Sequence, residues 1–213
     1  MNASDPQLDA IVLAGGTASR LGGGDKPALE VGGHSLLARV VLAAREAGAG
    51  RVVVVGPPRP ELDALVVREE PQGAGPVAAL RAGLGEVSAP WVAVLAADLP
   101  FLKGEHLAAL LAAGCDAGTG AVLADDGGQA QWLVGCWRTE RVRGAIGGYR
   151  GGSMRGLFGP LGPVMVRLPP DERGRPPWLD CDTPEDLRQA RAWCSRETGA
   201  PDPVGGMSGD ERA

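Results

Sequence analysis

Apolar positions in the first half of the chain follow two alternating patterns. Three short, largely apolar runs have the length of buried strands: 8–14, 51–55 and 91–97. Three other segments have apolar positions at helical spacing: 34–47, 76–86 and 103–113. The pattern also predicts a helical turn at 61–65 and a short strand at 65–68. Strands and helices that alternate in this way predict an α/β fold with a mainly parallel sheet and helices on both faces.

The second half of the chain has a less regular pattern. Residues 117–124 and 130–137 predict a hairpin whose turn is the sequence DDGG at 125–128. A further strand is predicted at 164–168 and a final helix at 184–194. These elements continue the same α/β layout.

The chain has 213 residues, which suits a single domain with a tail. From residue 196 onward it is rich in Gly, Pro and charged residues and has almost no apolar periodicity. Such a segment buries too little apolar surface to offset the entropy of ordering. We therefore expect one domain over 1–195 and a disordered tail over 196–213.

Charge and cysteine content narrow the class of protein. The formal net charge is −5, and no basic stripe is present, which argues against nucleic acid as a partner. No apolar run approaches the roughly 20 residues of a membrane span, and the first residues lack a secretion leader. The four cysteines form no CxxC pair and only two histidines accompany them, which argues against structural zinc. We expect a cytoplasmic protein with reduced thiols and no membrane partner.

Candidate chemistry follows the ends of three predicted strands. Gly15-Gly16, Glu69-Glu70 and Asp98 each stand at or just beyond such an end. Ligands of open α/β folds bind beyond the carboxyl ends of the parallel strands. Residues far apart in the sequence are therefore expected to converge on one crevice.

The most informative segment is LAGGTASRLGGGDK at 13–26. Its glycines allow backbone N–H groups to approach a ligand closely, and Arg20 and Lys26 supply positive charge for phosphates. The segment fits neither the Walker A pattern nor the dinucleotide G-x-G-x-x-G pattern. It is interpreted as a triphosphate-binding loop, the alternative being a flexible loop in a glycine-rich chain.

This loop resembles the signature of the MobA-like nucleotidyltransferases. Three further segments resemble the same family in the same order: EEPQGAGPVAAL at 69–80, AADLPFL at 96–102 and DCDTPEDL at 180–187. The resemblance covers about residues 9–195. It implies a single-domain, Rossmann-like three-layer α/β sandwich and Mg²⁺ dependence. It also implies transfer of GMP from GTP to the terminal phosphate of molybdopterin, with release of pyrophosphate.

The resemblance assigns roles to individual positions. Its nucleotide-binding positions are Leu13, Ala14, Gly15, Gly16, Lys26, Glu70, Gly75 and Asp98. Its catalytic positions are Arg20, Lys26 and Asp98, of which Arg20 and Lys26 contact phosphates. The alternative for each cation is a solvated surface charge, and for Leu13 and Ala14 it is plain strand packing.

Glu70 corresponds to the carboxylate that recognises the base in this family. A carboxylate accepts hydrogen bonds from N1–H and the exocyclic amino group of guanine. The family position is usually aspartate, so Glu70 is a departure from it, and Glu69 is the alternative reader. A pair of surface acids before a proline turn is the structural alternative.

Asp98 corresponds to the metal-binding aspartate of the family, and Mg²⁺ prefers hard carboxylate oxygens. An Asx turn before Leu99-Pro100 is the structural alternative. Asp180 or Asp182 either completes the Mg²⁺ site, with Asp182 favoured, or orients the pterin phosphate. Both also suit the entry to a helix.

Aromatic and thiol side chains add little to this picture. Trp132, Trp137 and Trp178 are candidates for stacking on a pterin ring, with ordinary packing as the alternative. Cys181 is interpreted as a buried thiol.

Three other functions remain open from the sequence. One is CTP-dependent transfer to the same cofactor, and another is transfer to a sugar phosphate. The third is a non-enzymatic nucleotide-binding module in molybdoenzyme assembly. Molybdoenzyme assembly proteins are accordingly candidate partners.

Overall fold

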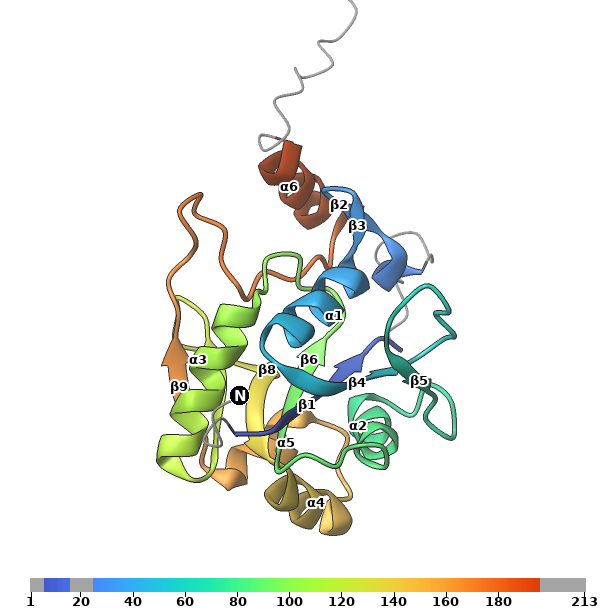
Figure 1. The fold of residues 1–213 in the computed structure, drawn as a ribbon, viewed down its shortest axis with the longest axis vertical. Coiled ribbons are helices and arrows are strands. Elements are labelled where there is room, and N and C mark those ends of the chain that lie inside the picture. Colours follow the sequence, from blue (N-terminus) through green and yellow to red (C-terminus); the bar gives the residue numbers. More distant parts are fainter. Residues whose placement is uncertain (1–5, 16–24, 196–213) are drawn as a thin grey trace, which may run out of the picture.

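The computed structural model describes residues 6–15 and 25–195. A seven-stranded sheet runs through the molecule in the order β5-β4-β1-β6-β8-β7-β9 (Figure 1). Its strands are β1 Leu8–Leu13, β4 Ala49–Val55, β5 Leu65–Val67, β6 Trp91–Ala96, β7 Gly120–Ala124, β8 Ala130–Arg138 and β9 Val164–Arg167. Only β8 runs against its two neighbours, and the other pairs in the sheet are parallel. The expected mainly parallel sheet is confirmed.

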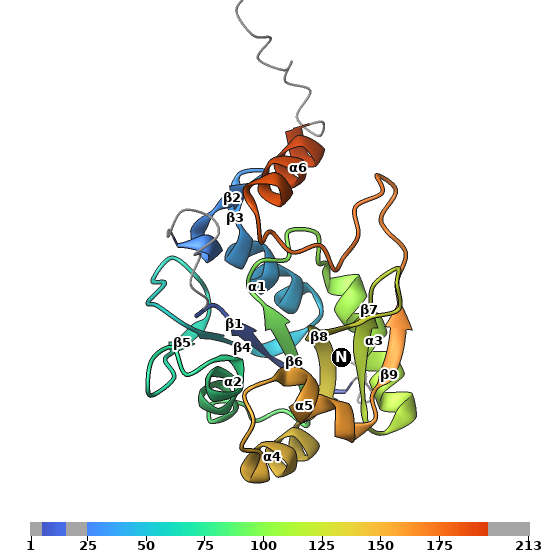
Figure 2. The ribbon, with the colours of Figure 1, turned by 180° about the vertical axis from the view of Figure 1, so that it is seen from behind.

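Helices cover both faces of this sheet. They are α1 Leu36–Glu46, α2 Pro76–Leu84, α3 Gly104–Ala117, α4 Thr139–Gly148, α5 Met154–Phe158 and α6 Pro184–Ser195. The first and third pack on one face, and the second, fourth and fifth pack on the other (Figures 1 and 2). The three-layer arrangement that the resemblance implied is confirmed.

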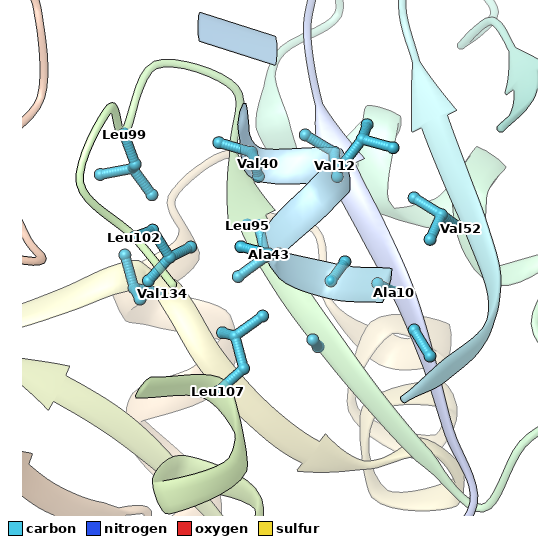
Figure 3. Close-up of a cluster of buried hydrophobic side chains, with 14 of the residues drawn as sticks. Ala10, Val12, Val40, Ala43, Val52, Leu95, Leu99, Leu102, Leu107 and Val134 are labelled. Carbon is cyan, nitrogen blue, oxygen red and sulfur yellow. The ribbon is translucent and has the colours of Figure 1, made fainter. Parts of the chain in front are cut away.

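The core follows the alternation of side chains along each strand. Ala10 and Val12 of β1 face α1, where they join the cluster that contains Val40 and Leu95 (Figure 3). Ile11, between them in sequence, belongs to the cluster on the opposite face. Continuous apolar runs are therefore required in the central strands, because both faces are buried.

A third, smaller apolar cluster lies above the carboxyl ends of the strands. There α6 packs beside a two-stranded ribbon formed by β2 Glu30–Val31 and β3 His34–Ser35 (Figure 1). Val31, Phe101 and Cys181 are buried in this cluster. The segment before α6 is also tied to the sheet edge, because Cys181 N–H donates to the Asp98 carbonyl at 3.2 Å.

Some local expectations were wrong or incomplete. The helical turn predicted at 61–65 is instead a turn followed by bends, with Leu62 N–H donating to the Arg59 carbonyl at 3.1 Å. Pro57, Pro58 and Pro60 remove backbone donors just before it, which opposes helix formation. The sequence pattern also missed α4, α5 and the β2–β3 ribbon. The predicted tail at 196–213 lies outside the described residues.

No helix in the described segments combines the length and apolar character of a membrane span.

Candidate functional site

A cleft of about 440 Å³ opens at the carboxyl edge of the sheet. Its walls come from the ends of β1 and β6, the segment after β5, the start of α2 and the segment before α6. Of the strand-end residues that the sequence singled out, Gly15, Glu69 and Asp98 converge on this cleft, as expected from the topology.

The floor of the cleft is the backbone just after β1. Ala14 N–H donates to the Val55 carbonyl at 2.8 Å, so the chain leaves β1 close beside the end of β4. A Cβ atom at Gly56 would lie 2.9 Å from the Ala14 carbonyl oxygen, so glycine is required for this approach. Leu13, Ala14 and Gly15 all line the cleft. Gly16 and Arg20 lie outside the described residues, and their roles stay predictions.

One end of the cleft, here called the charged end, is formed by Lys26, Asp98 and Asp182. The Lys26 ammonium makes ion pairs with both carboxylates. The side chains of Lys26 and Asp98 are 14% and 18% exposed, whereas that of Asp182 is 50% exposed. Burial opposes the charge of Lys26, but the two carboxylates outweigh it and raise its pKa above the ordinary value. Lys26 is therefore fully charged at neutral pH.

Asp98 has one carboxylate oxygen committed and one free. Its Oδ2 pairs with Lys26, whereas its Oδ1 is buried and has no hydrogen-bond partner among the described residues. A buried carboxylate oxygen without a partner is unfavourable unless a ligand satisfies it. Partial burial and then the nearby charges of Asp182 and Asp98 raise the pKa of Asp180 above its ordinary value.

The charged end fits a magnesium ion of the kind that nucleotide enzymes use. Mg²⁺ commonly takes one or two protein carboxylates and completes its shell with water and substrate phosphates. Asp98 and Asp182 provide such a pair, with Asp98 Oδ1 still unsatisfied. No cluster of three or more His, Cys, Asp or Glu suitable for a metal occurs within residues 6–15 and 25–195. A site held mainly by protein ligands is thus not seen there.

The other end of the cleft, here called the Glu69 end, lies beyond β5. Glu69 is 6% exposed and lines the cleft, and its Oε1 accepts the Gly73 N–H at 3.0 Å. Glu70 is exposed and does not line the cleft. Gly75 also lines it and precedes α2 with a φ of 92°, a conformation that favours glycine.

The aromatic and thiol candidates lie in or against the apolar clusters. Trp137 is fully buried and stacks on Phe158, with ring centroids 4.1 Å apart, so it is not available for a pterin. Trp178 packs against the apolar cluster that contains Ala10, and Trp132 packs against the cluster that contains Ile11. Burial raises the pKa of the Cys181 thiol to about 12, so it is a neutral buried thiol at physiological pH, as predicted.

Sequence reasoning missed Arg59, which lies on the loop between β4 and β5. Its guanidinium pairs with Asp25 at 2.5 Å, and its side chain is only 11% exposed. This ion pair fixes the residue immediately before Lys26. No sequence spacing indicated it, because the partners are 34 residues apart.

Comparison with known proteins gives relatives over most of the chain. A protein of Rhodopseudomonas palustris (strain HaA2) named molybdenum cofactor guanylyltransferase is 30% identical over 92% of this chain and 96% of its own. One from Mycobacterium avium (strain 104), named probable molybdenum cofactor guanylyltransferase, is 34% identical over 89% of this chain and 100% of its own.

Solved structures share the fold at lower identity. Molybdopterin-guanine dinucleotide biosynthesis protein A from Archaeoglobus fulgidus superposes with a TM-score of 0.67 at 21% identity. That match covers 88% of this chain and 99% of the other. The 2-C-methyl-D-erythritol 4-phosphate cytidylyltransferase from Thermus thermophilus also has a TM-score of 0.67, at 23% identity, over 89% and 99% of the two chains.

The MobA-like NTP transferase domain matches residues 10–164, a span that contains most of the cleft. Together with the relatives above, this match shows that the chain belongs to the family of MobA-like NTP transferase domains.

Proposed function

We propose that the chain transfers GMP from GTP to the terminal phosphate of molybdopterin and releases pyrophosphate. The observation that carries this proposal is the charged end of the cleft, where Lys26 bridges Asp98 and Asp182 beside the backbone after β1. The names of relatives that align over nearly the whole chain support the choice of substrates.

In this proposal the triphosphate lies at the charged end of the cleft. Lys26 carries the positive charge there, and the backbone of Ala14 and Gly15 runs alongside. On binding, the ammonium of Lys26 exchanges part of its carboxylate contact for phosphate oxygens. Fixed positive charge of this kind stabilises the leaving pyrophosphate more than the ground state.

The reaction needs no general base from the protein. An anionic oxygen of the molybdopterin phosphate attacks the α-phosphorus of GTP and forms a new P–O bond. The bond from the α-phosphorus to the bridging oxygen breaks, and pyrophosphate leaves with that electron pair. Asp98 and Asp182 are proposed to hold Mg²⁺, which when bound neutralises charge on the phosphate oxygens.

Several finer assignments belong to the same proposal. Arg20 is proposed to contact phosphates, and Asp180 to orient the acceptor phosphate. Glu69 rather than Glu70 is proposed to read the guanine base, because only Glu69 lines the cleft.

We place the reaction in the cytoplasm, where free cysteines such as Cys136, Cys181 and Cys194 stay reduced. Molybdoenzyme assembly proteins are the proposed recipients of the product.

The direct test is to incubate the purified chain with molybdopterin, Mg²⁺ and each of the four NTPs in turn. Pyrophosphate release and the mass of the modified pterin are measured. Among the four NTPs, only GTP is expected to give pyrophosphate release. Release with CTP alone would indicate a cytidylyltransferase, and turnover of a sugar 1-phosphate in place of molybdopterin would indicate a sugar-phosphate enzyme. No release with any NTP would favour a non-enzymatic module.

A further inference from the structure

Asp25 and Lys26 are consecutive residues whose side chains reach opposite sides of β1. The Lys26 ammonium pairs with Asp98, which follows β6. The Asp25 carboxylate pairs instead with Arg59, which follows β4. In the sheet, β4 and β6 are the two neighbours of β1. The two residues are therefore tied on both sides of the cleft floor, which the backbone just after β1 forms.

The carboxylate of Asp25 is committed to Arg59 rather than to its own turn. Asp25 immediately precedes the short 3₁₀ turn Lys26–Ala28, a position where an aspartate often accepts a hydrogen bond from a backbone N–H of the turn. Its side chain makes no such bond, and its Oδ1 accepts from a guanidinium nitrogen of Arg59 at 2.5 Å. A local cap is thus given up for a contact between residues 34 positions apart.

Arg59 is itself firmly placed. Pro58 and Pro60 flank it and restrict its backbone, and its carbonyl accepts the Leu62 N–H at 3.1 Å. Its side chain is mostly buried, and its Nε is enclosed without a hydrogen-bond partner among the described residues. A buried donor without an acceptor costs free energy, so the contact with Asp25 holds the side chain there against that cost.

The contact between Arg59 and Asp25 matters most when a nucleotide is bound. In the proposed function Lys26 exchanges part of its carboxylate contact for phosphate oxygens, so its own ion pairs hold the backbone at 25–26 less firmly. The pair of Asp25 with Arg59 lies outside the cleft lining and is not subject to that exchange. A fixed ammonium serves the phosphates better than a mobile one, because a misplacement of about 1 Å can cost a large factor in rate.

We propose that Arg59 is a positioning residue for Lys26, an inference that rests on the proposed function for placing the triphosphate at the charged end. Arg59 does not line the cleft, so it is not placed to touch substrate. It acts through Asp25, which holds the backbone from which the Lys26 side chain extends toward the phosphates. The contact joins one guanidinium nitrogen to one carboxylate oxygen, so it needs a positive charge rather than the planar fork of arginine.

The test measures equilibrium affinity for GTP with Mg²⁺ in wild type, Arg59→Met, Lys26→Met and the double variant. With Lys26 present, Arg59→Met should lower the affinity about 3- to 10-fold, the scale of coupling between interacting residues. In the Lys26→Met background the same change should alter the affinity less than about twofold, because no ammonium remains to be placed. Arg59→Lys keeps the charge and should stay within about twofold of wild type.

Two further variants separate this role from a merely structural one. Asp25→Asn removes the same contact from its exposed partner, and it should reproduce the loss seen in Arg59→Met even if the latter folds poorly. Arg45→Met removes another arginine–aspartate pair, the one with Asp63 at 3.4 Å. It should lower the melting temperature without changing the affinity for GTP.

An equal fall in affinity with and without Lys26 would overturn this inference. Wild-type affinity in both Arg59→Met and Asp25→Asn would overturn it as well, and so would a comparable fall in Arg45→Met. These results would leave the proposed function intact, because that function is judged by pyrophosphate release. Conversely, the expected coupling in a chain that releases no pyrophosphate from any NTP would keep Arg59 as a positioning residue for a bound triphosphate and overturn the proposed function.

Discussion

The charged end and the Glu69 end of the cleft are built in opposite ways. At the charged end, Lys26 joins Asp98 and Asp182, which lie 72 and 156 residues away in sequence. At the other end, Glu69 is held by a backbone N–H only four residues away. The first depends on the assembly of the whole fold, and the second on one short loop. Changes at the charged end should therefore affect transfer, and changes at the Glu69 end should affect selection.

The largest effect is expected from Asp98→Asn, which keeps the size of the side chain but removes its charge. Metal-ion stabilisation is worth several kcal/mol in a transition state, and each ~1.4 kcal/mol is a factor of ten in rate. Turnover should fall at least about a hundredfold, with little change in metal-free nucleotide binding. Melting temperature is the control for folding. A variant that keeps a third of wild-type turnover would remove Asp98 from the active site.

Lys26→Met should give the next largest effect, through loss of a charge that both carboxylates share. Nucleotide affinity is expected to fall about 10- to 100-fold, the scale of hydrogen bonds to charged groups. Affinity for Mg²⁺ without nucleotide should rise, because no ammonium competes for Asp98 and Asp182. Calorimetric titration measures both. Lys103→Met is the matched control. Lys103 does not line the cleft, and its ammonium pairs with the Glu105 carboxylate at 3.5 Å, so this variant should leave both affinities unchanged.

A smaller effect, an increase in melting temperature, is expected from Asp180→Asn. Burial and the charges of Asp182 and Asp98 raise the pKa of Asp180, so its ionised form is disfavoured in the folded state. Removing the charge should raise the melting temperature at pH 7 by about 1–3 °C. The gain should vanish as the pH falls below about 4, where wild-type Asp180 is protonated. A fall in melting temperature at pH 7 would contradict this account.

The smallest effect is expected from truncation after residue 196. The segment has little apolar surface to bury. Melting temperature and turnover should stay close to those of the full chain. A large fall in either would show that the segment contacts the domain.

Sequence patterns predicted the layers of the fold because its central strands are buried on both faces. The stretches 10–14, 52–55 and 91–97 have no polar interruption, and each ends near a cleft residue. The helix α4 escaped the pattern because Gly144, Gly147 and Gly148 weaken helix propensity within it. Packing of Val142 and Ile146 in the apolar cluster that contains Ile11 compensates for this.

The candidate site was predictable in its residue types and only partly in its geometry. Asp98 and Lys26 were identifiable because each occurs in a recognisable motif at a strand end or loop. The choice between Glu69 and Glu70 was not, because a step of one residue near the end of a strand reverses which side chain faces inward. Nor could spacing show that Lys26 meets Asp182, since that contact depends on α6 packing over the sheet edge.

The separation of transfer from selection is tested most directly by one ratio in Asp98→Asn. Its turnover with GTP and with inosine triphosphate, whose base lacks only the exocyclic amino group of guanine, is measured and compared with the same ratio in wild type. The account predicts that both rates fall at least about a hundredfold while their ratio stays within about twofold of wild type, because Glu69 is untouched. A ratio that collapses toward one would show that the two ends of the cleft act as a single unit, and would contradict the account.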